Sequence, residues 1–357
     1  MDGRERAAIR RLRAGVVPSW ALERLSVAYE QIKKVVDQSL ERVLAQKQIG
    51  PVFVEGEWGV GKTHLLSYVQ ASARTLGVPC ALINLDASSS ALNYPQRFYA
   101  TIAERLSLEE HHGLKAIVTH IVCDQRTRPL VYAFSKSPES GDLSYALSVL
   151  CHSALSGEEA VAEEQNSWNI LLGLDLNWST YGYKRRDALA RISALARMFG
   201  ATGLGGLVVL FDEAETVDQL WNIRSRLTAY TTIGSMCQSA GLWAIFGITE
   251  RFNQTLAEDI RRLAQERFFV EQNAHWFLTR WQKTSFDIVT PPSIDRALAR
   301  MVAERVAKLY RDAYQVDLNE VHFDQVVAEW ASNPIRNPRR LIRSIVERMD
   351  RARQIEF

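Results

Sequence analysis

The fold of this chain is decided by one stretch of eight residues, Gly56-Glu57-Trp58-Gly59-Val60-Gly61-Lys62-Thr63. It has the pattern G-x-x-x-x-G-K-[ST] of a phosphate-binding loop. An apolar run over residues 51–54 precedes it and an amphipathic run over residues 64–76 follows it, which predicts a strand, a loop and a helix. Glycines allow positive φ angles, and the backbone N–H groups at a helix N-terminus attract anions. The stretch therefore predicts a P-loop, the alternative being a glycine-rich turn that matches the pattern by accident.

The P-loop predicts ATP and Mg²⁺ as cofactors. The Lys62 ammonium can reach the β- and γ-phosphates, and the Thr63 hydroxyl can hold Mg²⁺. The predicted nucleotide-binding residues are Gly56, Glu57, Trp58, Gly59, Val60, Gly61, Lys62, Thr63 and His64.

A second informative stretch is the apolar run Leu207–Phe211, which ends in Asp212 and Glu213. A fully apolar run of this length predicts a buried parallel strand, and ligands bind at the carboxyl ends of such strands. We expect Asp212 to hold Mg²⁺, directly or through water, and Glu213 to polarise the attacking water. The alternative is an acidic strand end that is merely solvated.

Composition excludes several other classes of protein. The 357 residues are 47% hydrophobic and 24% charged with a formal net charge of +2, which is ordinary for a globular protein with two or three domains. Four widely spaced cysteines predict neither a zinc site nor a disulfide framework. Residues 1–6 lack the apolar segment of a signal peptide, and the longest apolar run, residues 204–211, is too short to span a bilayer. We therefore expect a cytoplasmic protein without a membrane partner.

The order of apolar runs predicts an α/β fold, a parallel sheet flanked by helices. Residues 80–85 and 242–248 provide further strands, and residues 286–292 close the core, with two prolines that mark its boundary. We divide the chain into an N-terminal helical segment (1–50), an ATPase core (51–292) with a helical insertion (109–184), and a C-terminal helical lid (293–357).

Polar residues after the later strands are further site candidates. Thr249, at the end of the strand over residues 242–248, is a candidate sensor of the γ-phosphate or the water, although a plain strand-end threonine fits nearly as well. A helix to about Glu266 carries Arg262 and ends at Arg267. Either arginine could act in trans on the nucleotide of a neighbouring copy, which implies a homo-oligomer, or could form a surface salt bridge. The aromatic stretch 267–270 is expected to re-enter the core.

The lid contains the last candidate, Arg339. Asn337 and Pro338 predict the N-cap and first residue of the final helix, so Arg339 lies in its first turn, where it could reach the γ-phosphate. Ser293 is expected to cap the preceding long helix. Seven arginines between Arg336 and Arg353 make this the most basic segment, and its surface is expected to be solvated or to bind a partner.

With these residues in place the chain resembles an ATPase of the AAA+ class, related to its initiator branch (Orc/Cdc6-like). More closely it resembles the BrxD-like ATP-binding proteins of BREX phage defence. The resemblance is carried by the long insertion and by three stretches, Leu12–Pro18, Phe211–Glu215 and Arg336–Ile342. It implies an AAA+ core with a helical lid, and a role in restricting phage with other defence proteins, on or near double-stranded DNA.

Three functions remain open. The first is an ATP-hydrolysing motor or switch that assembles with itself or with partners on DNA. The second is a nucleotide-dependent scaffold that hydrolyses slowly and makes no direct DNA contact. The third is a replication-initiator-like DNA-binding ATPase, which would normally add a winged-helix domain after the lid, whereas this sequence ends at Phe357.

Overall fold

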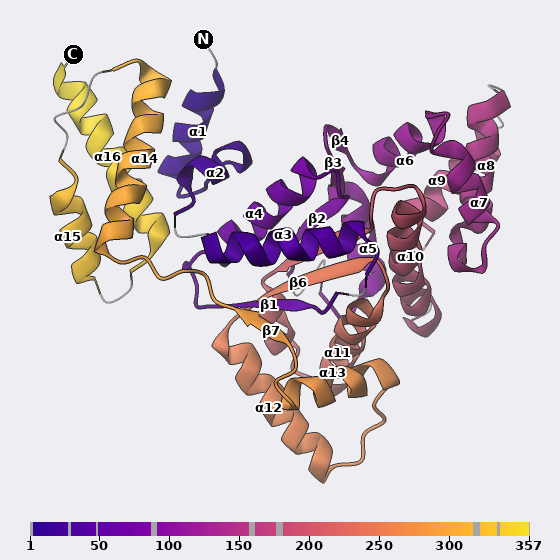
Figure 1. The fold of residues 1–357 in the computed structure, drawn as a ribbon. Helices are drawn as coiled ribbons and strands as arrows, with labels where there is room; N and C mark the ends of the chain where they lie inside the picture. Colours follow the sequence, from indigo (N-terminus) through magenta and orange to yellow (C-terminus); the bar gives the residue numbers. More distant parts are fainter. Residues whose placement is uncertain are drawn as a thin grey trace. The chain divides into compact units, whose positions relative to one another are not determined.

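The computed structural model describes residues 3–27, 30–47, 49–86, 91–156, 161–175, 181–316, 322–333 and 336–356 (Figure 1). Part of the predicted insertion, residues 157–160 and 176–180, lies outside these ranges. The chain forms two compact units. Unit 1 comprises Met1–Val35, Gly56–Ala71 and Thr290–Phe357, and unit 2 comprises Val36–Glu55 and Ser72–Val289.

Unit 2 contains a seven-stranded sheet in the described part of the chain, ordered β4-β3-β2-β5-β6-β1-β7. Its strands are β1 (Val52–Glu55), β2 (Cys80–Asn84), β3 (Ser107–Leu108), β4 (His111–His112), β5 (Leu207–Asp212), β6 (Leu242–Ile248) and β7 (Asp287–Val289). The strands β2, β5, β6, β1 and β7 pair in parallel, which confirms the α/β fold. The antiparallel hairpin β3–β4 at one edge was not predicted from the sequence.

Helices flank this sheet and share one apolar core with it. They are α5 (Pro95–Arg105), α10 (Tyr181–Ala201), α11 (Ile223–Gln238), α12 (Glu250–Gln265) and α13 (Gln272–Gln282), with the 3₁₀ turn η3 (Ala214–Gln219) after β5. The described residues of the predicted insertion form β4 and then helices, of which α6 (Leu114–Cys123) contacts β3 and β4 (Figure 1). It is followed by α7 (Arg128–Ser135), η2 (Pro138–Ser140), α8 (Leu143–Ser156) and α9 (Val161–Leu171).

Stacked aromatic rings fix the centre of the sheet. The ring of Phe246 on β6 stacks on Phe53 of β1 at 5.3 Å between centroids and on Phe211 of β5 at 5.1 Å. All three side chains are fully buried. Aromatic pairs at such spacings add stabilisation beyond the area they bury. They therefore hold the register of the three strands whose carboxyl ends carry the predicted site.

Unit 1 has a separate core made by the two ends of the chain. It contains α1 (Gly3–Arg13), η1 (Ser19–Ala21), α2 (Leu22–Leu25), α14 (Arg296–Tyr314), α15 (Asp324–Ser332) and α16 (Pro338–Glu356). Arg13 of α1 donates two hydrogen bonds to Asp350 of α16, at 2.8 and 2.7 Å, and one to Tyr314 of α14 at 3.1 Å. The first helices of the predicted N-terminal segment thus pack with the helices of the predicted lid. The helix α3 (Glu30–Leu44) follows, and the P-loop leads into α4 (Lys62–Thr75).

Three local predictions can be compared with this structure. The predicted cap of α16 is confirmed, because the Asn337 side-chain oxygen accepts from the Arg339 N–H at 2.9 Å. The prediction that Ser293 caps α14 was wrong, since Asp295 accepts from the Leu298 N–H at 2.8 Å. The expectation that residues 267–270 re-enter the core was also wrong in part, because Phe269 is 88% exposed.

A helix that crosses a bilayer must be both long and predominantly apolar. Within the ranges given above, every helix is too short or too polar to cross one.

Candidate functional site

The P-loop backbone has the conformation that its glycines predict. Gly59 and Gly61 have φ angles of 86° and 115°, a region that residues with side chains rarely adopt. A Cβ on Gly56 would lie 2.5 Å from Cγ2 of Val60, so there is no room for a side chain there. Each glycine of the motif is thus required by the local backbone or by its neighbours.

Lys62 is folded into the loop. Its side chain is buried, with the residue 6% exposed, and Nζ donates to the Gly56 carbonyl at 2.5 Å. Thr63 lies at the start of α4 and is exposed. The loop therefore presents backbone N–H groups, a helix N-terminus and an ammonium group together, the combination that binds phosphate.

His64 joins the start of α4 to the end of α2. Its Nε2 is 2.8 Å from the Ser26 hydroxyl, which itself donates to the Leu22 carbonyl at 2.7 Å. Because the hydroxyl has one hydrogen, the His64 ring must be the donor in the bond to Ser26. Burial lowers the pKa of His64 to about 4, so the ring is neutral near pH 7. This contact fixes the side chain of His64, which directly follows Thr63, the predicted Mg²⁺ ligand.

Two segments of the C-terminal region of unit 1 contact the P-loop glycines. Atoms of Pro291 lie 3.7 Å and 3.9 Å from the Cβ positions of Gly56 and Gly61. The carboxamide of Asn337 lies against Gly59, with its Cγ 2.8 Å from the Cβ position of that glycine. Neither residue was predicted from the sequence to contact the loop.

In unit 2, Asp212 is the last residue of the strand β5, and Glu213 directly follows it. Every residue of β5 is buried, and Asp212 is 6% exposed. The Glu213 N–H donates to Oδ1 of Asp212 at 3.1 Å, which orients that carboxylate. Glu213 itself has φ 61° and ψ 37°, a left-handed conformation that is strained for a residue with a side chain. Strain of this kind is concentrated at functional sites.

The neighbouring strands add polar groups to the same edge of the sheet. Asn84 of β2 pairs in register with Asp212, and buried Thr249 follows β6 at the start of α12. Glu55, the last residue of β1, accepts a hydrogen bond from the Asn253 amide of α12. Sequence reasoning found Thr249 but missed Asn84 and Glu55, although each is the polar last residue of an otherwise apolar strand. A polar residue at the end of an apolar run is therefore the feature of the sequence that could have identified both residues.

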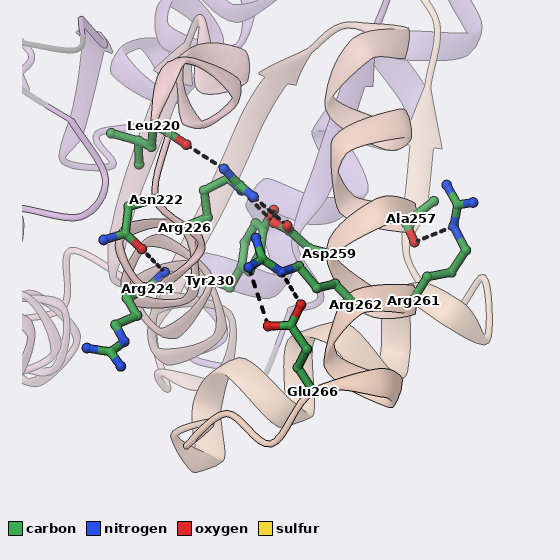
Figure 2. Close-up of polar contacts among 10 residues, drawn as sticks. All are labelled: Leu220, Asn222, Arg224, Arg226, Tyr230, Ala257, Asp259, Arg261, Arg262 and Glu266. Carbon is green, nitrogen blue, oxygen red and sulfur yellow. Dashed lines mark hydrogen bonds and ion pairs between the residues drawn. The ribbon is translucent and has the colours of Figure 1, made fainter.

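A buried ion pair holds α12 against α11 (Figure 2). Arg226 of α11 donates to both oxygens of Asp259 at 2.7 and 2.6 Å and to the Leu220 carbonyl at 2.5 Å. Asp259 is 2% exposed and also accepts from the Tyr230 hydroxyl at 2.9 Å. Since α12 begins directly after Thr249, this network fixes the end of β6. Neither Asp259 nor Arg226 was singled out in the sequence.

The two candidate finger arginines lie at the exposed end of α12. Arg262 donates to Glu266 at 2.9 Å, with each side chain about half exposed, and stacks over Phe268 at 5.5 Å. Figure 2 draws the hydrogen bonds between Arg262 and Glu266 below those of the buried Arg226–Asp259 pair. Arg267 is exposed just after the helix. The surface salt bridge that the sequence left open is therefore present for Arg262.

Arg339 lies in the first turn of α16 and is exposed. Its Cβ is 3.3 Å from the Cβ position of Gly15, at the end of α1. The neighbouring Arg343 donates to the Ala14 carbonyl at 2.7 Å. The start of α16 thus contacts the end of α1, and its cap residue contacts the P-loop.

Comparison with known proteins identifies the family. The family model described as BREX system ATP-binding protein BrxC/D matches residues 2–163 and 182–356, nearly the whole chain. These ranges include the P-loop, the Asp212–Glu213 strand end and the start of α16. No curated protein matches the chain. The chain belongs to the BrxC/D family of BREX system ATP-binding proteins.

Proposed function

We propose that this BREX protein is an ATPase that acts as a nucleotide-dependent switch. The observation that carries the proposal is the Asp212–Glu213 pair, with Glu213 in a left-handed conformation at the carboxyl end of the central strand β5. A protein that only bound ATP would not need a strained glutamate there. A carboxylate beside a Mg²⁺ ligand is what water activation requires.

In this proposal each predicted residue has one role. Lys62 binds the β- and γ-phosphates, and Thr63 and Asp212 hold Mg²⁺. Glu213 polarises the attacking water, and Thr249 contacts the γ-phosphate or that water. When bound, Mg²⁺ would neutralise charge at the phosphates, and the hydroxyl of Thr63 and the carboxylate of Asp212 are oxygen ligands of the kind that Mg²⁺ prefers.

Arginines would link the nucleotide to assembly. Arg339 would contact the γ-phosphate, which ADP lacks, so its contact would distinguish the two nucleotides. A differential contact of this kind shifts the population of two conformations. Arg262 or Arg267 would act on the nucleotide of a second copy, which requires a homo-oligomer.

Partners are proposed from charge and from membership of the BREX system. Unit 1 has 21 Lys and Arg against 15 Asp and Glu, so it carries +6 of a chain whose net charge is +2. Exposed arginines of α16, Arg340, Arg348 and Arg351, contribute to this charge. Such a surface suits double-stranded DNA or an acidic protein of the same defence system. Arg353, by contrast, stacks on Tyr314 at 4.1 Å and serves the fold of unit 1.

The alternative is a scaffold that binds ATP, hydrolyses it slowly and makes no direct contact with DNA. Steady-state ATP hydrolysis with and without double-stranded DNA separates the two functions. The wild-type protein is compared with Glu213→Gln, which keeps the shape of the side chain. The switch predicts that Glu213→Gln retains ATP binding and loses roughly 10²-fold or more in hydrolysis, the range for loss of a general base. Equal turnover by both proteins would contradict the proposal and would move the search to Glu215.

DNA binding tests the nucleotide coupling separately. The purified protein is titrated with double-stranded DNA in the presence of an ATP analogue, ADP or no nucleotide, at two salt concentrations. The proposal predicts that affinity depends on the nucleotide, falls steeply with salt, and loses its nucleotide dependence in Arg339→Ala. Equal affinity in all three nucleotide states of the wild type would contradict the coupling. No binding to DNA would leave an acidic protein as the partner.

A further inference from the structure

Asn337 is held in one orientation by the elements around it. Its side-chain oxygen Oδ1 accepts from the Arg339 N–H at 2.9 Å, and its backbone carbonyl accepts from the indole N–H of Trp330 on α15 at 3.0 Å. Because an amide oxygen accepts and an amide nitrogen donates, the capping bond assigns the two ends of the carboxamide. The donor Nδ2 therefore points away from the helix.

That donor lies on the P-loop. A Cβ built on Gly59 would overlap Nδ2 of Asn337 and would lie 2.8 Å from Cγ and 3.1 Å from Oδ1. Gly59 is the middle glycine of the motif and has a positive φ of 86°. The N-cap of the last helix thus brings an oriented amide NH₂ group to the loop that binds phosphate. Both residues belong to unit 1.

We propose that Asn337 is a nucleotide-binding residue, whose amide NH₂ donates a hydrogen bond to a phosphate oxygen of ATP in the P-loop while its carbonyl oxygen caps α16. This inference rests on the proposed function, because it takes the P-loop as the ATP site. A neutral donor hydrogen-bonded to a phosphate makes a charge-assisted bond, and a donor fixed beforehand loses little entropy on binding.

The choice of asparagine follows from this double role. Asn, Asp and Ser cap helices about equally well, so capping alone does not require an amide. At Gly59, however, the three residues differ. Asp would place a negative charge against the phosphates, and the hydroxyl of the shorter Ser side chain would stay at the cap, one bond short of the Nδ2 position. Of the three residues, Asn is therefore the one that brings a donor to that position.

The test compares Asn337→Asp and Asn337→Ser with the wild type and with Lys62→Ala, using calorimetric titration with Mg·ATP. Both Asn337 variants keep the cap, so their melting temperatures without nucleotide should match the wild type. A hydrogen bond to a charged group corresponds to roughly tenfold to hundredfold in affinity. We expect a loss in that range for Asn337→Ser and a larger loss for Asn337→Asp.

The controls separate the inference from the function on which it rests. If Lys62→Ala loses ATP and both Asn337 variants bind it as the wild type does, the inference fails and the P-loop assignment stands. If Lys62→Ala binds ATP as the wild type does, both the inference about Asn337 and the P-loop assignment fail. If Asn337→Asp melts at a lower temperature, Asn337→Ser decides the outcome alone, and unchanged affinity in that variant overturns the inference.

Discussion

Replacing Glu213 with glycine should make the protein more stable and less active at once. The left-handed conformation of Glu213 costs a residue with a side chain about 1–2 kcal/mol, and glycine adopts it without that cost. Glycine also gives the unfolded chain more freedom, which costs about 0.4–1 kcal/mol. The difference is about 0–1.6 kcal/mol in favour of glycine, with a central value of about 0.8 kcal/mol. Since about 1 kcal/mol shifts the melting temperature of a large domain by about 2–4 °C, we expect an increase of about 1–4 °C.

Two further variants isolate the cause. Glu213→Ala removes the same carboxylate but keeps a Cβ, so it should retain the strain and melt below Glu213→Gly. Glu213→Gln keeps both the shape and the strain, and should melt as the wild type does. All three should hydrolyse ATP at least roughly 10²-fold more slowly, because each lacks the carboxylate that polarises water.

Thermal denaturation without nucleotide and steady-state hydrolysis are measured on the four proteins side by side. If Glu213→Gly melts at or below the temperature of Glu213→Ala, the backbone at residue 213 is not strained. If Glu213→Gly hydrolyses ATP at the wild-type rate, Glu213 does not polarise the attacking water.

Further predictions concern the elements that position this site. Asp218 lies in the 3₁₀ turn η3 that follows β5. Burial raises the pKa of Asp218 to about 6, so stability is lost as pH rises from about 4 to 6. Asp218→Asn should therefore melt higher than the wild type at pH 7.5, and the gain should vanish below about pH 4. Asp259→Asn leaves the Arg226 charge without its counterion and should cost about 3–5 kcal/mol in urea denaturation; a loss below 1 kcal/mol would contradict the buried pair. Arg262→Ala removes a surface ion pair worth only about 0.3–0.5 kcal/mol, so its stability should hardly change. A loss of ATP hydrolysis in Arg262→Ala or Arg267→Ala would therefore come from the finger role. A hydrolysis rate that is independent of protein concentration and unchanged in both variants would exclude that role.

Local features of the site could be predicted from the sequence because they depend on adjacent residues. The P-loop glycines, the buried strand β5 and the Asn337 cap each follow from the conformations that a few neighbouring residues allow. Glu55 and Asn84 could have been predicted in the same way, because each is the polar last residue of an otherwise apolar strand.

Features that depend on distant partners could not be predicted in this way. Apolar periodicity shows which face of α1 is buried, but not that α14 and α16 cover it. The partner of Asp259 lies 33 residues away on α11, and a single acidic residue on a helix gives no sign of burial. The strands β3 and β4 have two residues each, too few to show an alternating pattern. An aromatic residue such as Phe269 suggested a core position, yet its burial depends on what packs against it.

ATP binding by the P-loop can be measured through Lys62. Its ammonium is folded into the loop on the Gly56 carbonyl, so Lys62→Ala removes the positive charge nearest the phosphates while leaving the glycines in place. Calorimetric titration with Mg·ATP is compared for the wild type, Lys62→Ala and the control Lys283→Ala, whose lysine is exposed after α13. We predict binding by the wild type and the control and none by Lys62→Ala at the same melting temperature. Equal affinity in a folded Lys62→Ala protein would contradict the account.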